Sequence, residues 1–271
     1  MKAESMRRTK SQGYGRTSRQ YEIPGGDLLD SVTSILGIIA KPALINWAAN
    51  VERELCLEVA QAVYDETTAG PGGLAELTSM QFALAIRERL GSQRAHQRKL
   101  VKAGDIGTEV HNRIEWEIRS IMGLEQLAPP SELSPDAAVA WAAFSTWKQD
   151  VGLVPKGIEQ VVWSRMFGYA GTLDLFADVT VPVLGERTAV FDWKTGKAIY
   201  PEAKVQAAAY AHALLEMEHV KELPWGCIVR LPKLSTDPGF EVCWISPQEL
   251  EKHFQGFLAA KALWDWQQGA K

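Results

Sequence analysis

The spacing of apolar residues changes along the chain, from a helical period in its first half to a strand period in its second. Val110, Ile114, Ile118 and Ile121 recur every three or four residues and predict an amphipathic helix over 107–121. Other segments with helical character in this half are 41–64, 77–90 and 134–151. We therefore expect the first half to be mainly helical.

Short β-type runs dominate after residue 151. Three strands are predicted over 160–163, 168–181 and 187–193, followed by an alanine-rich helix over 202–218, a hairpin over 226–231 and 240–245, and a last helix from a capping box at 246–249 to about 268. This order of elements favours an α/β fold in which helices cover both faces of a mixed β-sheet.

Composition narrows the class of protein. A chain of 271 residues with 46% hydrophobic and 23% charged residues can bury a full core. Its three cysteines are scattered without a Cys-x-x-Cys motif, so we expect no disulfide framework or zinc ribbon, and a reducing cytoplasm fits. No apolar run suits a membrane span, and the N-terminus lacks the apolar core of a signal peptide.

The first 20 residues form a basic segment. They contain six basic residues and one acidic residue, whereas the whole chain has a formal net charge of −4. Because this segment is rich in Ser, Gly and Thr and lacks apolar periodicity, it is predicted to be a disordered tail over 1–20. Such a tail is either a solubilising leader or an arm that contacts nucleic-acid phosphates, and the sequence leaves both open.

Two acidic residues and a lysine lie in neighbouring predicted strands. Asp192 and Lys194 end an apolar run and, two residues apart in a strand, project from the same face. Asp174 lies 18 residues earlier in another strand-like run. Each feature alone is common, since an Asp often only hydrogen-bonds a turn. Together they could hold a hard divalent cation and direct a water, which predicts metal-assisted hydrolysis, with a phosphodiester as the usual target.

Other polar residues could complete such a site. His111 borders the apolar stripe of the 107–121 helix and could ligate a metal, although a lone helical histidine is more often structural. Glu115, four residues later, is a weaker candidate on the same face. Glu159 opens the first predicted strand, and a surface role suits it equally well.

Gln206 and Tyr210 share one face of the alanine-rich helix because they are four residues apart. The surrounding alanines allow either close packing or the close approach of a nucleic-acid strand. Alone, this pair would indicate a tyrosine packed in the core. The ring of Trp193, which points away from Asp192 and Lys194, is also expected in the core rather than stacked on a base.

Four motifs follow one another as Gly107-x-x-x-His111, Gly171-Thr-x-Asp174, Asp192-Trp-Lys194 and Gln206-x-x-x-Tyr210. This set resembles the PD-(D/E)xK nuclease superfamily, specifically its RecB-like exonuclease branch, over residues 104–215. Residues 30–36 and 44–48 also look like the leader of phage-type and mitochondrial-maintenance-type RecB-like exonucleases. The resemblance implies a single domain over 21–271. It would consist of a helical N-terminal part (21–103) and a restriction-endonuclease-like catalytic core (104–271), whose mixed central sheet is flanked by helices.

The resemblance also implies roles for the side chains. Ligands for Mg²⁺ or Mn²⁺ would be His111, Asp174, Asp192 and the backbone carbonyl of Trp193. Lys194 would orient the attacking water and offset charge in the transition state. Gln206 and Tyr210 would brace Lys194 or the scissile strand.

The implied activity is that of a metal-dependent DNA exonuclease. It would act on single strands or ends in phage, or in DNA recombination, repair or replication, in the cytoplasm of a bacterium or a phage-infected host. A recombination or replication protein is a possible partner, and no membrane is expected. Three separated cysteines do not match the four-cysteine iron–sulfur cluster of some relatives, so we expect none, and without a Walker A motif any helicase would be a separate protein.

Two other functions stay open. A structure-selective or restriction-like endonuclease would use the same residues, and a non-catalytic nucleic-acid-binding module could keep the same fold. The two acids beside a lysine argue against the second, because a protein that only binds has no physical reason to hold them together.

Overall fold

The chain divides into two compact units, Met1–Ile39 with Ile106–Lys271, and Ala40–Asp105. The computed structural model describes residues 8–13, 16–39, 41–69, 78–92, 94–124, 128, 130–182 and 185–269. None of the helices in these ranges is both long enough and apolar enough to cross a membrane.

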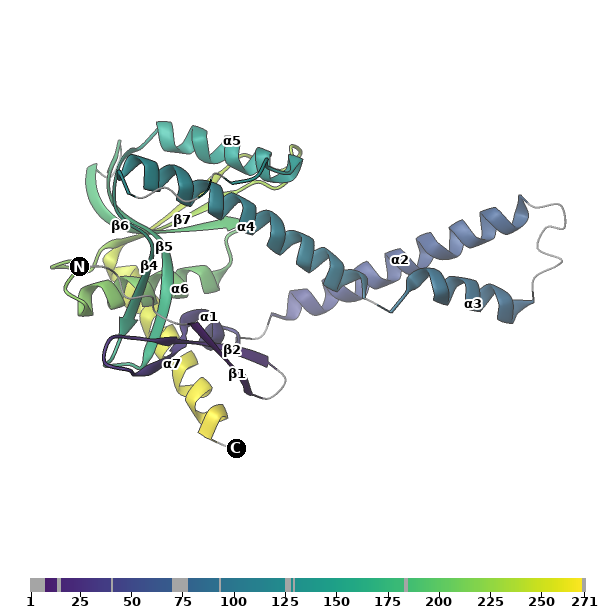
Figure 1. Ribbon diagram of the computed structural model, residues 1–271, viewed down its shortest axis with the longest axis horizontal. Coiled ribbons are helices and arrows are strands. Elements are labelled where there is room, and N and C mark those ends of the chain that lie inside the picture. The colour runs from purple at the N-terminus through teal and green to yellow at the C-terminus, as the bar shows by residue number, and fades with distance from the viewer. Residues whose placement is uncertain are drawn as a thin grey trace. The chain divides into compact units, whose positions relative to one another are not determined.

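The first unit is built on a mixed β-sheet (Figure 1). Its strands are β1 (Arg8–Gly13), β2 (Arg16–Glu22), β3 (Leu28–Ser31), β4 (Gly152–Ser164), β5 (Tyr169–Val181), β6 (Gly185–Thr195), β7 (Trp225–Leu231) and β8 (Glu241–Ile245). They follow the order β1-β2-β3-β5-β6-β7-β8, and β4 lies off this path and pairs with β5. The pairs β3–β5 and β6–β7 are parallel, and the other pairs are antiparallel.

Helices cover both faces of this sheet. The helices are α1 (Val32–Leu36), α6 (Pro201–Glu216) and α7 (Pro247–Gly269) on one face, and α5 (Pro135–Gln149) and the C-terminal half of α4 (Ala95–Ile121) on the other. Successive residues of the central strands enter opposite cores, so that Val190 packs beneath α6 and α7, and Phe191 packs beneath α4 and α5. The predicted α/β architecture is confirmed, and it is consistent with a restriction-endonuclease-like fold.

The second unit is helical. It contains α2 (Pro42–Thr68), α3 (Ser79–Leu90) and the N-terminal half of α4. A capping box between Thr78 and Gln81 begins α3. Glu66 forms an ion pair with Arg89, and Glu52 accepts a hydrogen bond from the backbone of His96 at 3.0 Å. The N-terminal helical part was expected over 21–103, and this helical unit spans Ala40–Asp105.

The N-terminal segment differs from its predicted disorder over 1–20. Arg8–Gly13 and Arg16–Glu22 form β1 and β2, whereas residues 1–7, 14 and 15 lie outside the described part. Pairing of β2 with β3 and burial of Tyr21, which is 2% exposed, hold this hairpin on the sheet. Apolar periodicity could not predict this hairpin, because its strands are polar and form only by pairing with each other and with β3.

Residues 21–39 also differ from expectation, because they belong to the sheet unit and not to the helical part. β3 pairs in parallel with the start of β5, and α1 places Val32 and Ile35 in the core beneath α6 and α7. The boundary of the helical part therefore lies near residue 40 and not at residue 21.

Candidate active site

A fork between two strands organises the site. Along one edge of β5, β3 pairs with Tyr169 and Ala170, and β6 pairs with Leu175 onwards. The β3 pairing ends at Ala170 and the β6 pairing begins at Leu175, so neither strand's pairing includes residues 171–174. β6 diverges from β5 directly after Phe191, so the next residue on β6 is Asp192 and the next on β5 is Asp174. The divergence opens the sheet where the two acids lie.

Asp174 holds the fork open with its side chain. Its Oδ2 accepts a hydrogen bond of 2.8 Å from the backbone N–H of Trp193, in place of a backbone ladder bond. The ring of Trp193 is 1% exposed and packs edge-on against Phe144 and Trp147. The expectation that this ring lies in the core is confirmed, and it fixes the backbone between Asp192 and Lys194.

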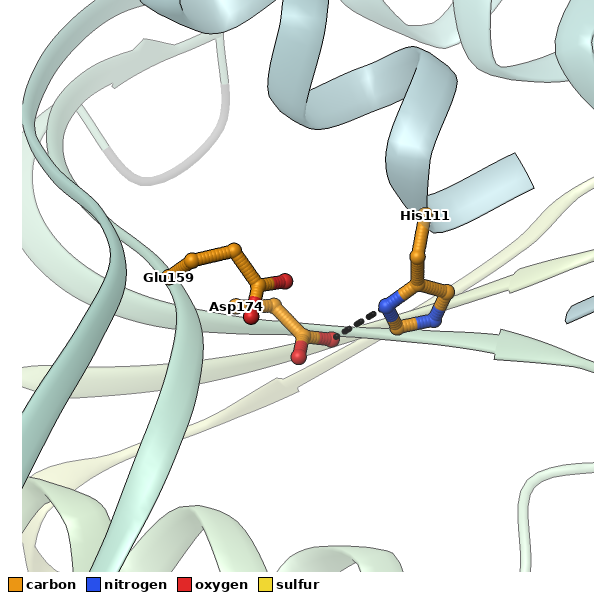
Figure 2. A group of neighbouring side chains, drawn as sticks. All are labelled: His111, Glu159 and Asp174. Carbon is orange, nitrogen blue, oxygen red and sulfur yellow. Dashed lines mark ion pairs between the residues drawn. The ribbon is translucent and has the colours of Figure 1, made fainter. Parts of the chain in front are cut away.

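Three potential metal ligands meet beside the fork (Figure 2). His111 from α4, Glu159 from β4 and Asp174 from β5 each offer one atom, and these atoms lie within 4.8 Å of one another. His111 Nδ1 lies 3.7 Å from Asp174 Oδ2. Asp192 is not part of this group, so the structure places the predicted ligands in two neighbouring sets.

The orientation of His111 follows from its second ring nitrogen. Nε2 lies 3.1 Å from the carbonyl oxygen of Trp193. A carbonyl can only accept, so Nε2 carries the proton, and in the neutral ring Nδ1 presents its lone pair toward Asp174. The Trp193 carbonyl, predicted as a metal ligand, is thus engaged with His111, and its second lone pair is the one that a cation would use.

Both strands that carry the carboxylates change face at this point. On β5, Leu173 packs beneath α6 and α7, but Leu175 packs beneath α4 and α5, so regular alternation is interrupted at Asp174. On β4, Glu159 has a left-handed backbone with φ of 46°, which costs a residue with a side chain about 1–2 kcal/mol. Strain of this kind persists where the surrounding structure imposes it, and it concentrates at functional sites.

Asp192 and Lys194 form the second set. Lys194 Nζ donates to Asp192 Oδ1 at 2.8 Å. Oδ2 lies equally close to Nζ without the alignment of a hydrogen bond, and no described residue donates to it. Asp192 is 1% exposed, so one oxygen of a buried carboxylate has no hydrogen bond.

Electrostatics in this set follow from burial and from the nearby acids. Burial raises the pKa of Asp192 to about 6. The positive charge of Lys194 lowers this pKa in part, and the negative charge of Asp174 raises it further. Burial alone would lower the pKa of Lys194, but the charges of Asp192 and Asp174 outweigh it and the pKa is raised. Lys194 is therefore an ammonium at neutral pH.

Gln206 and Tyr210 of α6 lie behind the lysine. Lys194 Nζ donates to Gln206 Oε1 at 3.3 Å, and Gln206 Nε2 donates to the hydroxyl of Tyr210 at 3.2 Å. A Cβ at Gly171 would lie 2.5 Å from the ring of Tyr210, so the glycine is what lets α6 approach the fork. The Gly-x-x-Asp and Gln-x-x-x-Tyr motifs are thus linked by packing.

The donor set fits a hard divalent cation. Glu159, Asp174 and Asp192 supply carboxylate oxygens, His111 supplies one imidazole nitrogen, and a carboxylate-rich set is typical of Mg²⁺ and Mn²⁺. The Asp192 oxygen without a hydrogen bond is what a bound cation would satisfy. The chain's own residues therefore provide both the ligands and the reason to bind an ion.

The structure changes the order of preference between two candidate metal ligands, Glu115 and Glu159. Glu115 lies 3.5 Å from Arg119, and it is not among the clustered ligands. Glu159, which the sequence left equally suited to the surface, joins His111 and Asp174. A usable signal existed, because Ser164 pairs with Tyr169 across the β4–β5 turn, and counting outward from this pair places Glu159 opposite Asp174.

Comparisons with known proteins add little to this picture. No protein-family model and no curated protein matches the sequence. Among solved structures, an alkaline exonuclease from Laribacter hongkongensis is similar at 11% identity and a TM-score of 0.30, over 67% of this chain and 88% of that chain. The structure of SSO0001 is similar at 11% identity and a TM-score of 0.22, over 57% of this chain and 73% of that chain. Such scores do not establish a shared fold, and the chemistry of the site rests on its own residues.

Proposed function

We propose that this protein is a metal-dependent deoxyribonuclease that hydrolyses phosphodiester bonds at the ends of single-stranded DNA. The observation that carries the proposal is the β5–β6 fork, where Asp174 and Asp192 lie on either side of the Trp193 backbone. At this fork the Lys194 ammonium lies beside Asp192, whose Oδ2 receives no hydrogen bond from a described residue. The order of the four sequence motifs supports the choice of a nuclease among metal-dependent hydrolases, and supports DNA ends as its substrate.

His111, Glu159, Asp174 and Asp192 would hold Mg²⁺ or Mn²⁺, with the Trp193 carbonyl as a further oxygen. When bound, such a cation lowers the pKa of a water and neutralises phosphate oxygens. His111 keeps its Nδ1 lone pair available because its other nitrogen donates to Trp193. The strained backbone of Glu159 keeps its carboxylate beside Asp174.

Lys194 supplies positive charge where a phosphate would bind. Because its pKa is raised, it does not take a proton from water at neutral pH, and it acts as a hydrogen-bond donor and a counter-charge. Its contact with Asp192 fixes the ammonium beside the proposed ligands. The ammonium is thus placed to orient a water and to stabilise charge that develops on the phosphate.

Gln206 and Tyr210 position Lys194. The Gln206 side chain accepts from the ammonium and donates to Tyr210, so a single chain of hydrogen bonds runs from α6 to the lysine. Burial raises the pKa of Tyr210, which keeps the phenol neutral. We propose that these residues hold the lysine without contacting the reacting atoms.

The proposal is tested with end-labelled linear single-stranded DNA and Mg²⁺ or Mn²⁺. Asp174→Asn and Asp192→Asn should each reduce the rate of hydrolysis by at least about 100-fold, since each removes a ligand charge. Asp178→Asn is the matched control, because Asp178 lies on the same strand and pairs with Lys156 on the surface.

Hydrolysis by both site variants at the rate of the control would contradict the assignment. A closed circular single strand separates the two nuclease activities, since an exonuclease leaves it intact and an endonuclease opens it. Chelation of divalent cations should stop hydrolysis of every substrate.

A further inference from the structure

A tyrosine from the N-terminal hairpin reaches the strand that carries Asp174. Tyr21 lies on β2, which the sheet order separates from β5 by β3. The register of β3 on β5 ends with Ser31 opposite Ala170, and the chain then turns into α1. Beyond that end, the Tyr21 hydroxyl lies 3.1 Å from Thr172 Oγ1. A side chain of β2 therefore extends past β3 and contacts β5.

The contact falls on the part of β5 that lies between two strand pairings. The pairing with β3 ends at Ala170, and the pairing with β6 begins at Leu175. On the opposite edge, the register with β4 includes Leu173 and Leu175 and leaves out Asp174. Thr172 lies in the middle of this interval. Side-chain contacts therefore supply a restraint here that the ladders of β3 and β6 do not supply.

Two tyrosines hold this interval from opposite faces of the sheet. A Cβ at Gly171 would lie 3.2 Å from the Tyr210 hydroxyl oxygen, so Tyr210 covers one face. The next residue, Thr172, directs its side chain to the other face, where Tyr21 contacts it. Tyr210 belongs to the core between the sheet and α6 and α7, whereas Tyr21 packs with Ala170 in a separate cluster. β5 is thus held on both faces just before Asp174.

Burial excludes a direct role for Tyr21 in contacting a substrate. The residue is 2% exposed. Its ring fills a small apolar cluster, and a phenylalanine ring would fill it equally well. Packing does not explain the hydroxyl, because a buried hydroxyl is costly unless it is hydrogen-bonded. The role that remains for this group is to hold β5 through Thr172.

Asp174 is the residue that depends on a fixed β5. Its Oδ2 accepts a hydrogen bond of 2.8 Å from the Trp193 N–H and lies 3.7 Å from His111 Nδ1. These two partners come from β6 and α4. A carboxylate keeps both only if the strand that carries it does not shift, since a functional site must be held to within about 0.5 Å.

We propose that Tyr21 is a positioning residue for Asp174 and acts through Thr172. The proposal rests on the role of Asp174 in the deoxyribonuclease site proposed above. The two hydroxyls fix β5 from the side of the N-terminal hairpin, so that the carboxylate stays at the Trp193 N–H and beside His111. The hairpin is then part of the structure that holds the proposed metal ligands.

Exchange of the Trp193 amide proton with solvent reports on Asp174, because this carboxylate accepts its hydrogen bond. It is measured by NMR on the ¹⁵N-labelled full chain, without metal or DNA. The test variants are Tyr21→Phe and Thr172→Val, which each remove a hydroxyl and keep the shape of the side chain. The amide of Val229, which is buried on β7, is the internal reference, since global destabilisation would accelerate its exchange too.

Tyr169→Phe is the matched control variant. Tyr169 is also a buried tyrosine and lies on β5 itself, but its hydroxyl donates to the backbone carbonyl of Ala209 at 2.9 Å. The control therefore loses a buried hydroxyl and its hydrogen bond without affecting the contact between Tyr21 and Thr172.

The Trp193 amide should exchange about fivefold faster than the reference predicts in each test variant, as expected for the loss of one hydrogen bond. The double variant should resemble either single variant, because both substitutions remove the same contact. Affinity for Mn²⁺, measured by calorimetry, should fall about tenfold in the test variants, the usual cost of losing a group that orients a ligand. Tyr169→Phe should match the wild type in both measurements.

An unchanged exchange rate of the Trp193 amide in Tyr21→Phe would overturn the inference, and so would an equal acceleration in Tyr169→Phe. Failure of the nuclease function has a different signature. Faster exchange confined to the test variants, in a protein whose wild type does not hydrolyse DNA, would support the positioning of Asp174 by Tyr21 and overturn only the proposed reaction.

Discussion

Asp192 is the residue whose surroundings most constrain the chemistry of the site. Its carboxyl group is 1% exposed, and burial raises its pKa to about 6. A cation that binds this carboxylate must displace the proton whenever the pH lies below that value. At higher pH the group is ionised, and burial of its charge makes a cation the favoured partner.

Affinity for Mn²⁺ should therefore depend on pH. It should weaken about tenfold per pH unit as the pH falls below the Asp192 pKa of about 6, and this proton linkage should fade above it. Isothermal titration calorimetry in two buffers of different ionisation enthalpy measures the protons released.

Asp192→Asn is the control for this linkage, because it removes the titrating group. At about one pH unit below the Asp192 pKa of about 6, the variant should bind Mn²⁺ weakly and release fewer protons than the wild type does. Wild-type protein that binds Mn²⁺ equally well on both sides of its Asp192 pKa would show that this carboxylate is not a ligand.

Which single residues matter could be predicted in part. The spacing of Asp174, Asp192 and Lys194 placed them in neighbouring strands, and the structure puts them at one fork. Glu159 was not ranked as a ligand, although the β4–β5 register sets it opposite Asp174, because the direction of its side chain also depends on a left-handed residue within the strand. A glutamate carries no local sequence signal for that conformation, which only the surrounding structure imposes.

The packing of α6 against β5 controls how the helix supports the site. Gly171 faces Tyr210 so closely that a Cβ would lie 2.5 Å from a ring carbon, and backbone or helix must shift to admit one. The adjacent Thr172 contacts Tyr21 of β2 at 3.1 Å, so the N-terminal hairpin also depends on this stretch of β5.

Gly171→Ala should therefore lower the free energy of unfolding by about 1–3 kcal/mol, the usual cost of overpacking a core. Urea denaturation measures it. In the background of Tyr210→Ala the same substitution should cost less, because the ring that it meets is gone. Gly239→Ala is the control, since nothing lies within 4 Å of its Cβ position.

Equal costs of Gly171→Ala with and without the Tyr210 ring would show that the ring does not limit the approach of α6.

Element positions were largely predictable from periodicity, as for α6 and β5. The polar strands β1 and β2 were not, because they have no apolar alternation and depend on pairing with β3. The fork likewise depends on which strands share an edge of β5, and local sequence does not encode this.

The chain as a whole combines a sheet unit that holds the candidate site with a helical unit over Ala40–Asp105. The order of helices and strands predicted the layers of the sheet unit. It did not predict that residues 21–39 would join that unit, because β3 is short and its partner lies more than a hundred residues away.

The central claim is that Lys194 assists hydrolysis of DNA beside a cation held at the fork. The most direct test is the single-turnover rate constant for hydrolysis of end-labelled single-stranded DNA by Lys194→Ala at saturating Mn²⁺, with Lys156→Ala as the control. We predict a fall of at least about 100-fold with Mn²⁺ affinity retained, because the ammonium is needed for the transition state and not for the ion. A Lys194→Ala protein that cuts DNA at the wild-type rate would contradict the account.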